Sequence, residues 1–158
     1  AHSSLRILIH GGDNMLGRAV QLSFPVQAPG EELIKDSCTA AHYLDLCLDH
    51  PSGRENDPTL QEIRSMNANH GSYLWGDYLG MYVMPPPDLR LLNIETAVTK
   101  SIDNKDLPRW KSIRYHMHSD NYETAMRGFL SHGGEQPASP VVVNFANNHA
   151  MDYGRQAL

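Results

Sequence analysis

The chain has 158 residues, a length that suits one domain, and we expect a single domain over residues 1–158. The 13 Lys and Arg residues are outnumbered by 18 Asp and Glu residues, so the formal net charge of −5 argues against a nucleic-acid partner. The longest apolar stretches, at residues 5–9 and 141–143, are far shorter than the roughly 18 residues that a membrane span needs. These values predict a soluble globular protein with no membrane span in this chain.

The start of the chain and the two cysteines bear on the compartment. No secretory signal peptide is visible at the N-terminus. Cys38 and Cys47 both fall in the stretch 31–50, whose apolar spacing predicts an amphipathic helix. At their spacing along a helix the two side chains point to opposite faces, so we expect two free thiols, buried or half-buried. Free thiols favour a reducing compartment, and a cytoplasmic location is expected.

The first third of the chain is predicted to contain one strand and two helices. Branched residues at 5–10 predict a buried strand that ends in a turn at Gly11-Gly12-Asp13. A helix is expected over 15–24, followed by the helix over 31–50. Residues 51–73 are polar and predict a long surface loop with one helical turn near 60–66.

The remaining residues are predicted to contain three strands and a helix. The strands are expected over 89–94, 114–118 and 141–145, and the helix over 119–130. Asp120 and Glu123 have the spacing of a capping box at the start of this helix. Its apolar face is formed by Tyr122, Ala125, Met126 and Phe129. Strands separated by helical connections favour an α/β fold with a largely parallel sheet.

Polar side chains follow three of the predicted strands. Asp13 follows the first strand, Glu95 follows the second, and Asn148 and His149 follow the last. The carboxyl ends of parallel strands line one edge of a sheet, so these side chains should converge. Two carboxylates, an amide oxygen and an imidazole suit Mn, Mg, Fe or Zn, and a bridging carboxylate would allow two metal ions. The alternative is that these residues only form turns, in which Asp and Asn are common.

Other motifs with known chemistry do not fit. Residues 12–19 have the glycine spacing of a phosphate-binding P-loop but lack the Lys and the Ser or Thr that end it. The dinucleotide pattern G-x-G-x-x-G and the G-x-S-x-G nucleophile elbow are absent from the sequence. The strand-end residues therefore carry the functional prediction.

Five segments resemble the bacterial capsule-synthesis, poly-gamma-glutamate biosynthesis (CapA) family, in the order of that family's motifs. They are GDNMLGR at 12–18, WGD at 75–77, DLRLLNIETAVT at 88–99, YHMH at 115–118 and NFANNHAMDYG at 144–154. The resemblance covers nearly the whole chain, and its last segment is the most diagnostic.

That family is similar to the calcineurin-like metallophosphoesterases, and the resemblance implies a two-sheet sandwich with helices outside and a dinuclear metal site. It implies that Asp13 and Asn148 ligate the metals and that Glu95 replaces the usual bridging aspartate. His149 would be the catalytic acid or stabilise the leaving group, and Arg18 would attract an anionic substrate. The resemblance also implies that only the N-terminal half of the domain is present, truncated at its C-terminus.

Two functions are open at this point. The first is metal-dependent hydrolysis of a phosphoester or an anionic polymer in capsule or polyglutamate synthesis, with an anionic small molecule or polymer as substrate. The second is a non-catalytic scaffold or binding subunit that retains the fold with a degraded metal site. Met15 favours the second, because calcineurin-like enzymes usually carry a His two positions after the first Asp. Another chain or the missing C-terminal half is the expected partner.

Overall fold

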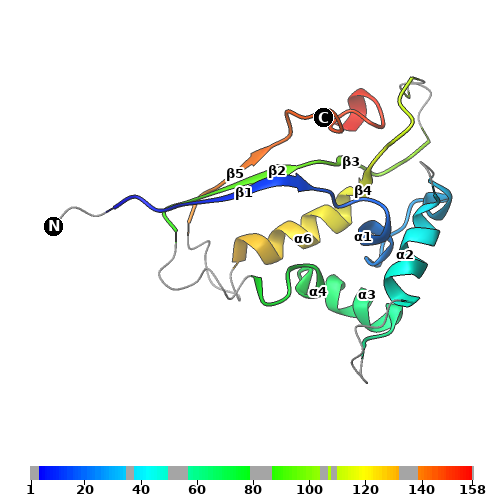
Figure 1. Cartoon of the computed structure of the whole chain (residues 1–158), viewed down its shortest axis with the longest axis horizontal. Coiled ribbons are helices and arrows are strands. Elements are labelled where there is room, and N and C mark those ends of the chain that lie inside the picture. Colours follow the sequence, from blue (N-terminus) through cyan, green and yellow to red (C-terminus); the bar gives the residue numbers. More distant parts are fainter. Residues whose placement is uncertain are drawn as a thin grey trace.

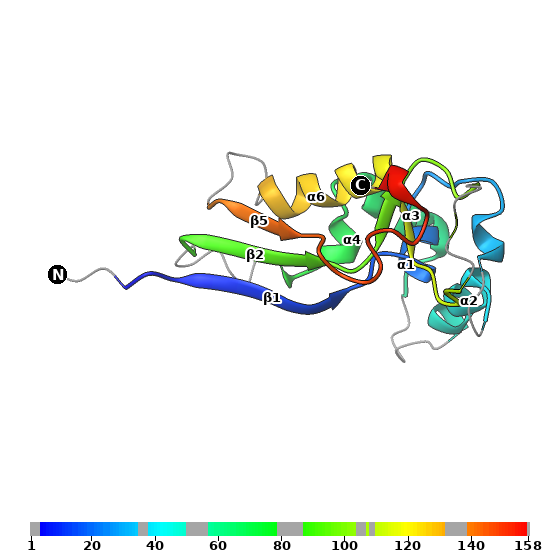
Figure 2. The same ribbon diagram turned by 90° about the horizontal axis from the view of Figure 1, so that it is seen from above.

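The main sheet has three parallel strands, with β2 (Leu89–Ile94) between β1 (Ile7–Asn14) and β5 (Val141–Asn144). The computed structural model describes residues 4–34, 38–49, 57–78, 87–103, 107, 110–131 and 139–157. Figure 2 shows the three strands side by side in this order. The predicted α/β class and the parallel sheet are confirmed.

A second, two-stranded parallel sheet and short helices complete the described structure. The sheet pairs β3 (Ala97–Thr99) with β4 (His116–His118). The α-helices are α1 (Ala19–Leu22), α2 (Ala40–Asp49), α3 (Leu60–Ala68), α4 (Ser72–Trp75) and α6 (Ser119–Ser131). Two 3-10 helices are η1 (Glu31–Leu33) and η2 (Arg155–Ala157). Within the described residues, no helix is long and apolar enough to cross a membrane.

The core lies between the main sheet and α6, on the side of the sheet where the α-helices gather (Figure 1). Leu92 and Ile94 of β2 are fully buried there. Ala125 and Phe129 of α6 pack against them in the same cluster, as the predicted apolar face requires. Full burial of Leu92, Ile94 and Phe129 stabilises the fold by about 1.5–3 kcal/mol for each side chain, so this contact attaches α6 to the sheet.

The opposite face of the main sheet is apolar and exposed. Ile9 pairs with Leu91, and Leu91 pairs with Val142, so the three side chains form one row across the strands. Ile9 is 62% exposed and Val142 is 48% exposed. The prediction that residues 5–10 form a buried strand is therefore wrong, because the described α-helices gather on the other face of the sheet (Figure 1).

β1 continues through the residues that were expected to form a turn. The strand runs to Asn14, and its register against β2 shifts between His10 and Asn14. Gly12 lies within this irregular stretch at φ +88, a backbone conformation that favours glycine. The glycines thus produce a bulge that bends the strand end and do not terminate the strand.

The two predicted helices after β1 are shorter than expected. The helix predicted over 15–24 is reduced to α1, because the Leu16 N–H donates to Thr96 Oγ1 at 2.8 Å and holds the preceding residues in a loop. The helix predicted over 31–50 is divided into η1 and α2. Residues 35–37 and 50 lie outside the described part of the chain.

This division corrects the analysis of the two cysteines. Cys38 precedes α2 and is half-buried, whereas Cys47 lies on α2 and is exposed. The two residues do not share a helix, so the argument from opposite helix faces does not apply. Neither residue forms a disulfide bond in the described structure, and the exposure of Cys47 corrects the expectation that both thiols are buried or half-buried.

Two helix starts differ from the sequence analysis. The loop predicted over 51–73 contains α3 and α4, and α3 begins with a capping box in which the Glu62 N–H donates to Thr59 Oγ1 and the Thr59 N–H donates to Glu62 Oε2. Residues 51–56 lie outside the described structure. At the start of α6, the Asp120 N–H donates to the Nδ1 atom of His118, while Glu123 pairs with Arg127. The predicted capping box of α6 is therefore wrong.

A buried polar network joins β4 to the first third of the chain. His116 bonds Glu31 through Nδ1 and donates from Nε2 to the Thr99 carbonyl oxygen at 2.9 Å. The other carboxylate oxygen of Glu31 accepts from Gln21 Nε2 at 2.9 Å and from the Ala28 N–H at 3.0 Å. Because His116 and Glu31 are both 1% exposed, their polar atoms depend on each other for hydrogen bonds.

The substitution Glu31→Ala should lower the free energy of unfolding by about 3 kcal/mol or more, because several buried donors lose their acceptor. Urea unfolding followed by circular dichroism measures this change. The matched control is Glu32→Ala, an exposed neighbour, for which we expect a change within about 0.5 kcal/mol. Equal effects of the two substitutions would contradict the structural role given to Glu31.

Candidate strand-end site

The ends of the three main strands meet at one edge of the sheet, as the parallel arrangement predicts. Asn14 pairs with Ile94, and Asn93 pairs with Asn144. The segments that carry the predicted site residues leave the sheet from these positions. The site is thus built from neighbouring strands that are far apart in the sequence.

The side-chain amide of Asn93 connects these segments. Its Nδ2 atom donates to the Gly12 carbonyl oxygen at 3.1 Å and to Glu95 Oε2 at 2.9 Å. Its Oδ1 atom accepts from Asn144 Nδ2 at 2.8 Å and from Asn147 Nδ2 at 3.4 Å. One amide therefore bonds the end of β1, the residue after β2 and the end of β5.

The two predicted carboxylates differ in burial. Glu95 is 6% exposed, and its Oε1 atom has no hydrogen-bond partner among the described residues. Asp13 is exposed, and its carbonyl oxygen accepts from the Met15 N–H at 2.9 Å. Among the described residues, no three His, Cys, Asp or Glu side chains form a group that could hold a metal ion. The predicted metal ligands also include the side-chain amide of Asn148, and asparagine is not among these four residue types.

Asn147 fixes the start of the loop that holds Asn148 and His149. Its Nδ2 atom donates to the Ile94 carbonyl oxygen at 2.7 Å, and its Oδ1 atom accepts from the His149 N–H at 3.0 Å. Asn148 is exposed, whereas His149 is 8% exposed. The loop after β5 is thereby bonded to the end of β2.

The His149 imidazole is paired with a buried carboxylate. Its Nδ1 atom lies 2.5 Å from Asp152 Oδ2, and Asp152 is fully buried. A carboxylate that accepts from Nδ1 leaves Nε2 as the ring nitrogen that can reach a metal or a substrate, an arrangement common for histidines at such sites. Lys111 and the Tyr115 N–H also donate to this carboxylate.

Arg18 lies beside the site with its guanidinium against two aromatic rings. The guanidinium carbon is 4.6 Å from the centroid of Tyr43 and 4.7 Å from that of Tyr115. Arg18 also adopts φ +53, an uncommon value for a residue other than glycine. Since strained backbone conformations concentrate at functional sites, this position is notable next to the strand ends.

A cavity of about 490 Å³ opens beside the His149 loop. It is lined by Trp110, Lys111, Asn148, Met151, Asp152, Gly154 and Arg155. Trp110 is 85% exposed and Arg155 is also exposed, so an indole and a guanidinium are available to a bound molecule. The cavity combines apolar surface with cationic and amide groups.

Tyr153 follows Asp152 but is unsuited to proton transfer near neutral pH. It is 4% exposed, and its ring packs edge-on against His116 with centroids 5.1 Å apart. Burial, reinforced by the negative charge of Glu31, raises the pKa of Tyr153 far above its ordinary value. The phenol therefore stays neutral.

Sequence analysis missed several residues that organise the site. Asn93 and Asn147 belong to quoted motifs but were given no role. Asp152 lies three residues after His149, and that spacing in a turn is a local signal that could have identified the pair. Lys111 and Tyr115 come from a distant segment, and nothing in their local pattern indicates contact with His149.

Comparison with known proteins identifies the family. Two curated proteins from two strains of Mycobacterium tuberculosis, each described as a "probable polyglutamine synthesis accessory protein", are 30% identical over 152 residues. The matches cover 94% of this chain and 33% of each relative, so the chain spans about a third of their length. No solved structure matches the chain significantly. The model of the family described as "Bacterial capsule synthesis protein PGA_cap" matches residues 7–158. The chain therefore belongs to this bacterial capsule synthesis family.

Proposed function

We propose that this chain carries part of the active site of a metal-dependent hydrolase that acts on a phosphoester or an anionic polymer in capsule or polyglutamate synthesis. The observation that supports it most is the pairing of His149 with the fully buried Asp152 at the edge where the parallel strands end. Catalytic histidines commonly have such a carboxylate partner, which sets the tautomer and the orientation of the ring. A calcineurin-like arrangement of the complete domain is part of this proposal.

The proposed metal ligands are Asp13, Glu95 and Asn148. Their carboxylate and amide oxygens are the donors that hard divalent cations prefer, and Glu95 Oε1 and the exposed Asp13 carboxylate are not engaged by described residues. Mg²⁺ and Mn²⁺ sites often use one or two carboxylates and complete their coordination with water or substrate. The donor set therefore fits such a cation, with one or two ions bound.

The proposed chemistry assigns a role to each side chain. A divalent cation held by Asp13, Glu95 and Asn148 would supply polarisation of the substrate and a bound water of lowered pKa. His149 Nε2 would take up the proton released by the attacking water and pass it to the leaving group, while Asp152 holds Nδ1–H. Arg18 attracts the negative charge of the substrate, and the cavity beside Trp110 accommodates its remainder.

The relatives' description as accessory proteins supports action beside a synthesis complex. Neither Cys38 nor Cys47 forms a disulfide bond in the described structure, which is compatible with a reducing compartment, and we include a cytoplasmic location in the proposal.

A non-catalytic accessory role is the second candidate, and Met15 favours it. This residue occupies the position of a usual calcineurin-like histidine ligand. Met15 lines a mainly apolar groove together with Tyr43 and Leu46, and a methionine there supplies no imidazole ligand. In that case the strand-end residues would serve binding or structure only.

Mn²⁺ titration by calorimetry tests the metal site. We expect Asp13→Ala to weaken Mn²⁺ binding at least about tenfold, which corresponds to ~1.4 kcal/mol, because it removes a charged ligand. Asp45→Ala, at an exposed position on α2, is the matched control and should bind like the unmodified chain. Indistinguishable affinities for the two variants would rule out Asp13 as a ligand.

Hydrolysis of phosphomonoester, phosphodiester and γ-glutamyl test substrates, measured with Mn²⁺ on this chain and on the full-length protein, tests the catalytic role. The variant His149→Gln should lower kcat by about 10²–10⁴-fold, the usual contribution of a general acid, with Mn²⁺ affinity unchanged. Absence of turnover in the unmodified full-length protein, with function retained in Asp13→Ala, would instead establish the accessory role.

A further inference from the structure

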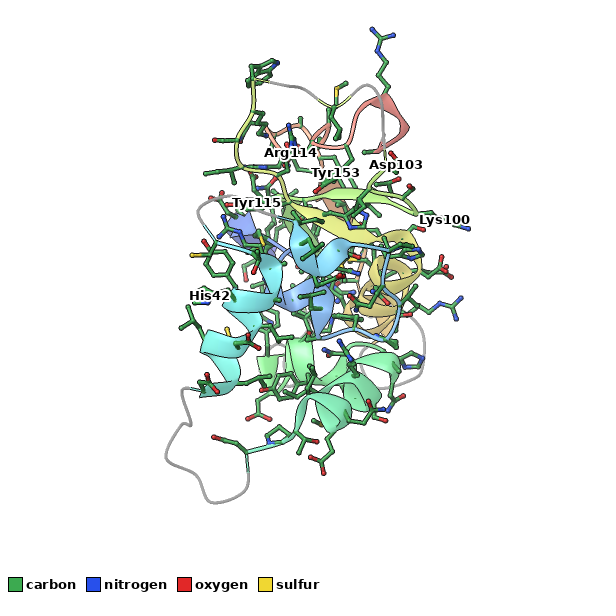
Figure 3. All side chains as sticks on the ribbon, turned by 90° about the vertical axis from the view of Figure 1, so that its right-hand side faces the viewer. His42, Lys100, Asp103, Arg114, Tyr115 and Tyr153 are labelled. Carbon is green, nitrogen blue, oxygen red and sulfur yellow. The ribbon has the colours of Figure 1, made fainter. Side chains whose placement is uncertain are left out.

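Residues Lys111 and Tyr115, in the segment before β4, both contact the loop after β5 that contains His149. The two segments are 37 to 41 residues apart in the sequence. Figure 3 shows Tyr115 near the C-terminal loop, at the same end of the molecule as Tyr153. The contact is therefore a tertiary one between two irregular segments.

Tyr115 contacts His149 in two ways. Its ring stacks on the imidazole, with centroids 4.1 Å apart and an angle of 22° between the planes. Its backbone N–H donates to Asp152 Oδ2 at 2.7 Å, the same oxygen that lies 2.5 Å from His149 Nδ1. Stacking on Tyr115 restricts tilting of the imidazole. The bond from Nδ1 to the Asp152 carboxylate restricts rotation of the imidazole within its own plane.

Lys111 holds the other side of the same carboxylate. Its Nζ atom donates to Asp152 Oδ1 and to the Asn148 carbonyl oxygen, and it lies 3.3 Å from His149 Nδ1. The Lys111 side chain is only 12% exposed, and that of Asp152 is fully buried. A buried carboxylate needs such charged donors, because its desolvation is otherwise uncompensated.

Tyr115 is itself held in place by neighbouring residues. The Arg18 guanidinium lies 4.7 Å from the Tyr115 centroid and 4.6 Å from that of Tyr43. His116, the residue after Tyr115, is fixed in the buried network with Glu31. The backbone and the ring of Tyr115 are thus both held in place.

We propose that Lys111 and Tyr115 are positioning residues that hold the His149 imidazole in one orientation, with Nδ1 toward Asp152 and Nε2 available for chemistry. The inference rests on the proposed function only for the role of His149. Orientation matters because a displacement of about 1 Å at a reacting group can cost roughly 100-fold in rate. Neither residue is required to touch substrate.

NMR of the unmodified chain, labelled with ¹⁵N-histidine and with aromatic side chains observed, gives the first test. We assign the His149 signals by their loss in His149→Gln. The expected result is a nuclear Overhauser contact between the rings of Tyr115 and His149, with upfield-shifted His149 ring protons and a ¹⁵N pattern of the Nδ1–H tautomer. Absence of the ring contact in the folded chain would overturn the proposal without any variant.

Variants then separate positioning from general stability. Tyr115→Leu keeps the backbone N–H and should move the His149 ring protons downfield, whereas Tyr115→Phe keeps the ring and should restore the unmodified spectrum. Lys111→Met should shift or double the His149 ¹⁵N signals. Lys100→Met is the control, because Lys100 is exposed and points away from Tyr115 (Figure 3), and it should leave the spectrum unchanged.

The outcomes distinguish this inference from the proposed function, since no readout depends on turnover or metal. His149 signals that stay unchanged in both folded Tyr115→Leu and folded Lys111→Met would overturn the positioning role. If one variant fails to fold, the His149 signals of the other variant and the ring contact in the unmodified chain still test the positioning role. Shifted His149 signals in a protein without hydrolytic activity would support positioning while refuting hydrolysis.

Discussion

The amide of Asn93 is the constraint on which the arrangement of the strand ends depends. It lies on the central strand and uses both of its polar atoms, donating toward Gly12 and Glu95 and accepting from Asn144 and Asn147. Parallel strands bring their carboxyl ends to one edge, but the backbone ladder ends before the loops begin. The amide continues the connection beyond the ladder and so fixes loops that regular hydrogen bonding does not reach.

The meeting of the strand ends could be predicted from the sequence, whereas the environment of His149 could not. Apolar runs identified β2, β5 and α6, and their alternation implied a parallel sheet with polar residues at one edge. The partners of Asp152 come from a segment about 40 residues away, and no local pattern encodes that contact. The metal ligands Asp13, Glu95 and Asn148 remain predictions.

The errors in the fold predictions have separate physical causes. The glycines at 11 and 12 predict the end of β1, but Gly12 permits a bulge within the strand. The helix expected after β1 was shortened because a side-chain hydroxyl, Thr96 Oγ1, captured the Leu16 N–H. The start of α3 is encoded locally, because Thr59 and Glu62 have the spacing of a capping box. Tertiary contacts therefore explain only some of the differences between the predicted and the observed helices and strands.

The order of strands in the main sheet has a consequence for the kinetics of folding. Arg6, just before β1, bonds Asp88, 82 residues later, and Asn93 bonds Asn144, 51 residues later. Contacts between such distant segments form slowly, because long loops must close before any hydrogen bond is gained. The helices can form early from local interactions, but the edge that carries Asp13, Glu95 and His149 exists only after both long connections have closed. The candidate site is thus expected to be among the last parts of this chain to assemble and among the first to be lost when β2 separates from its neighbours.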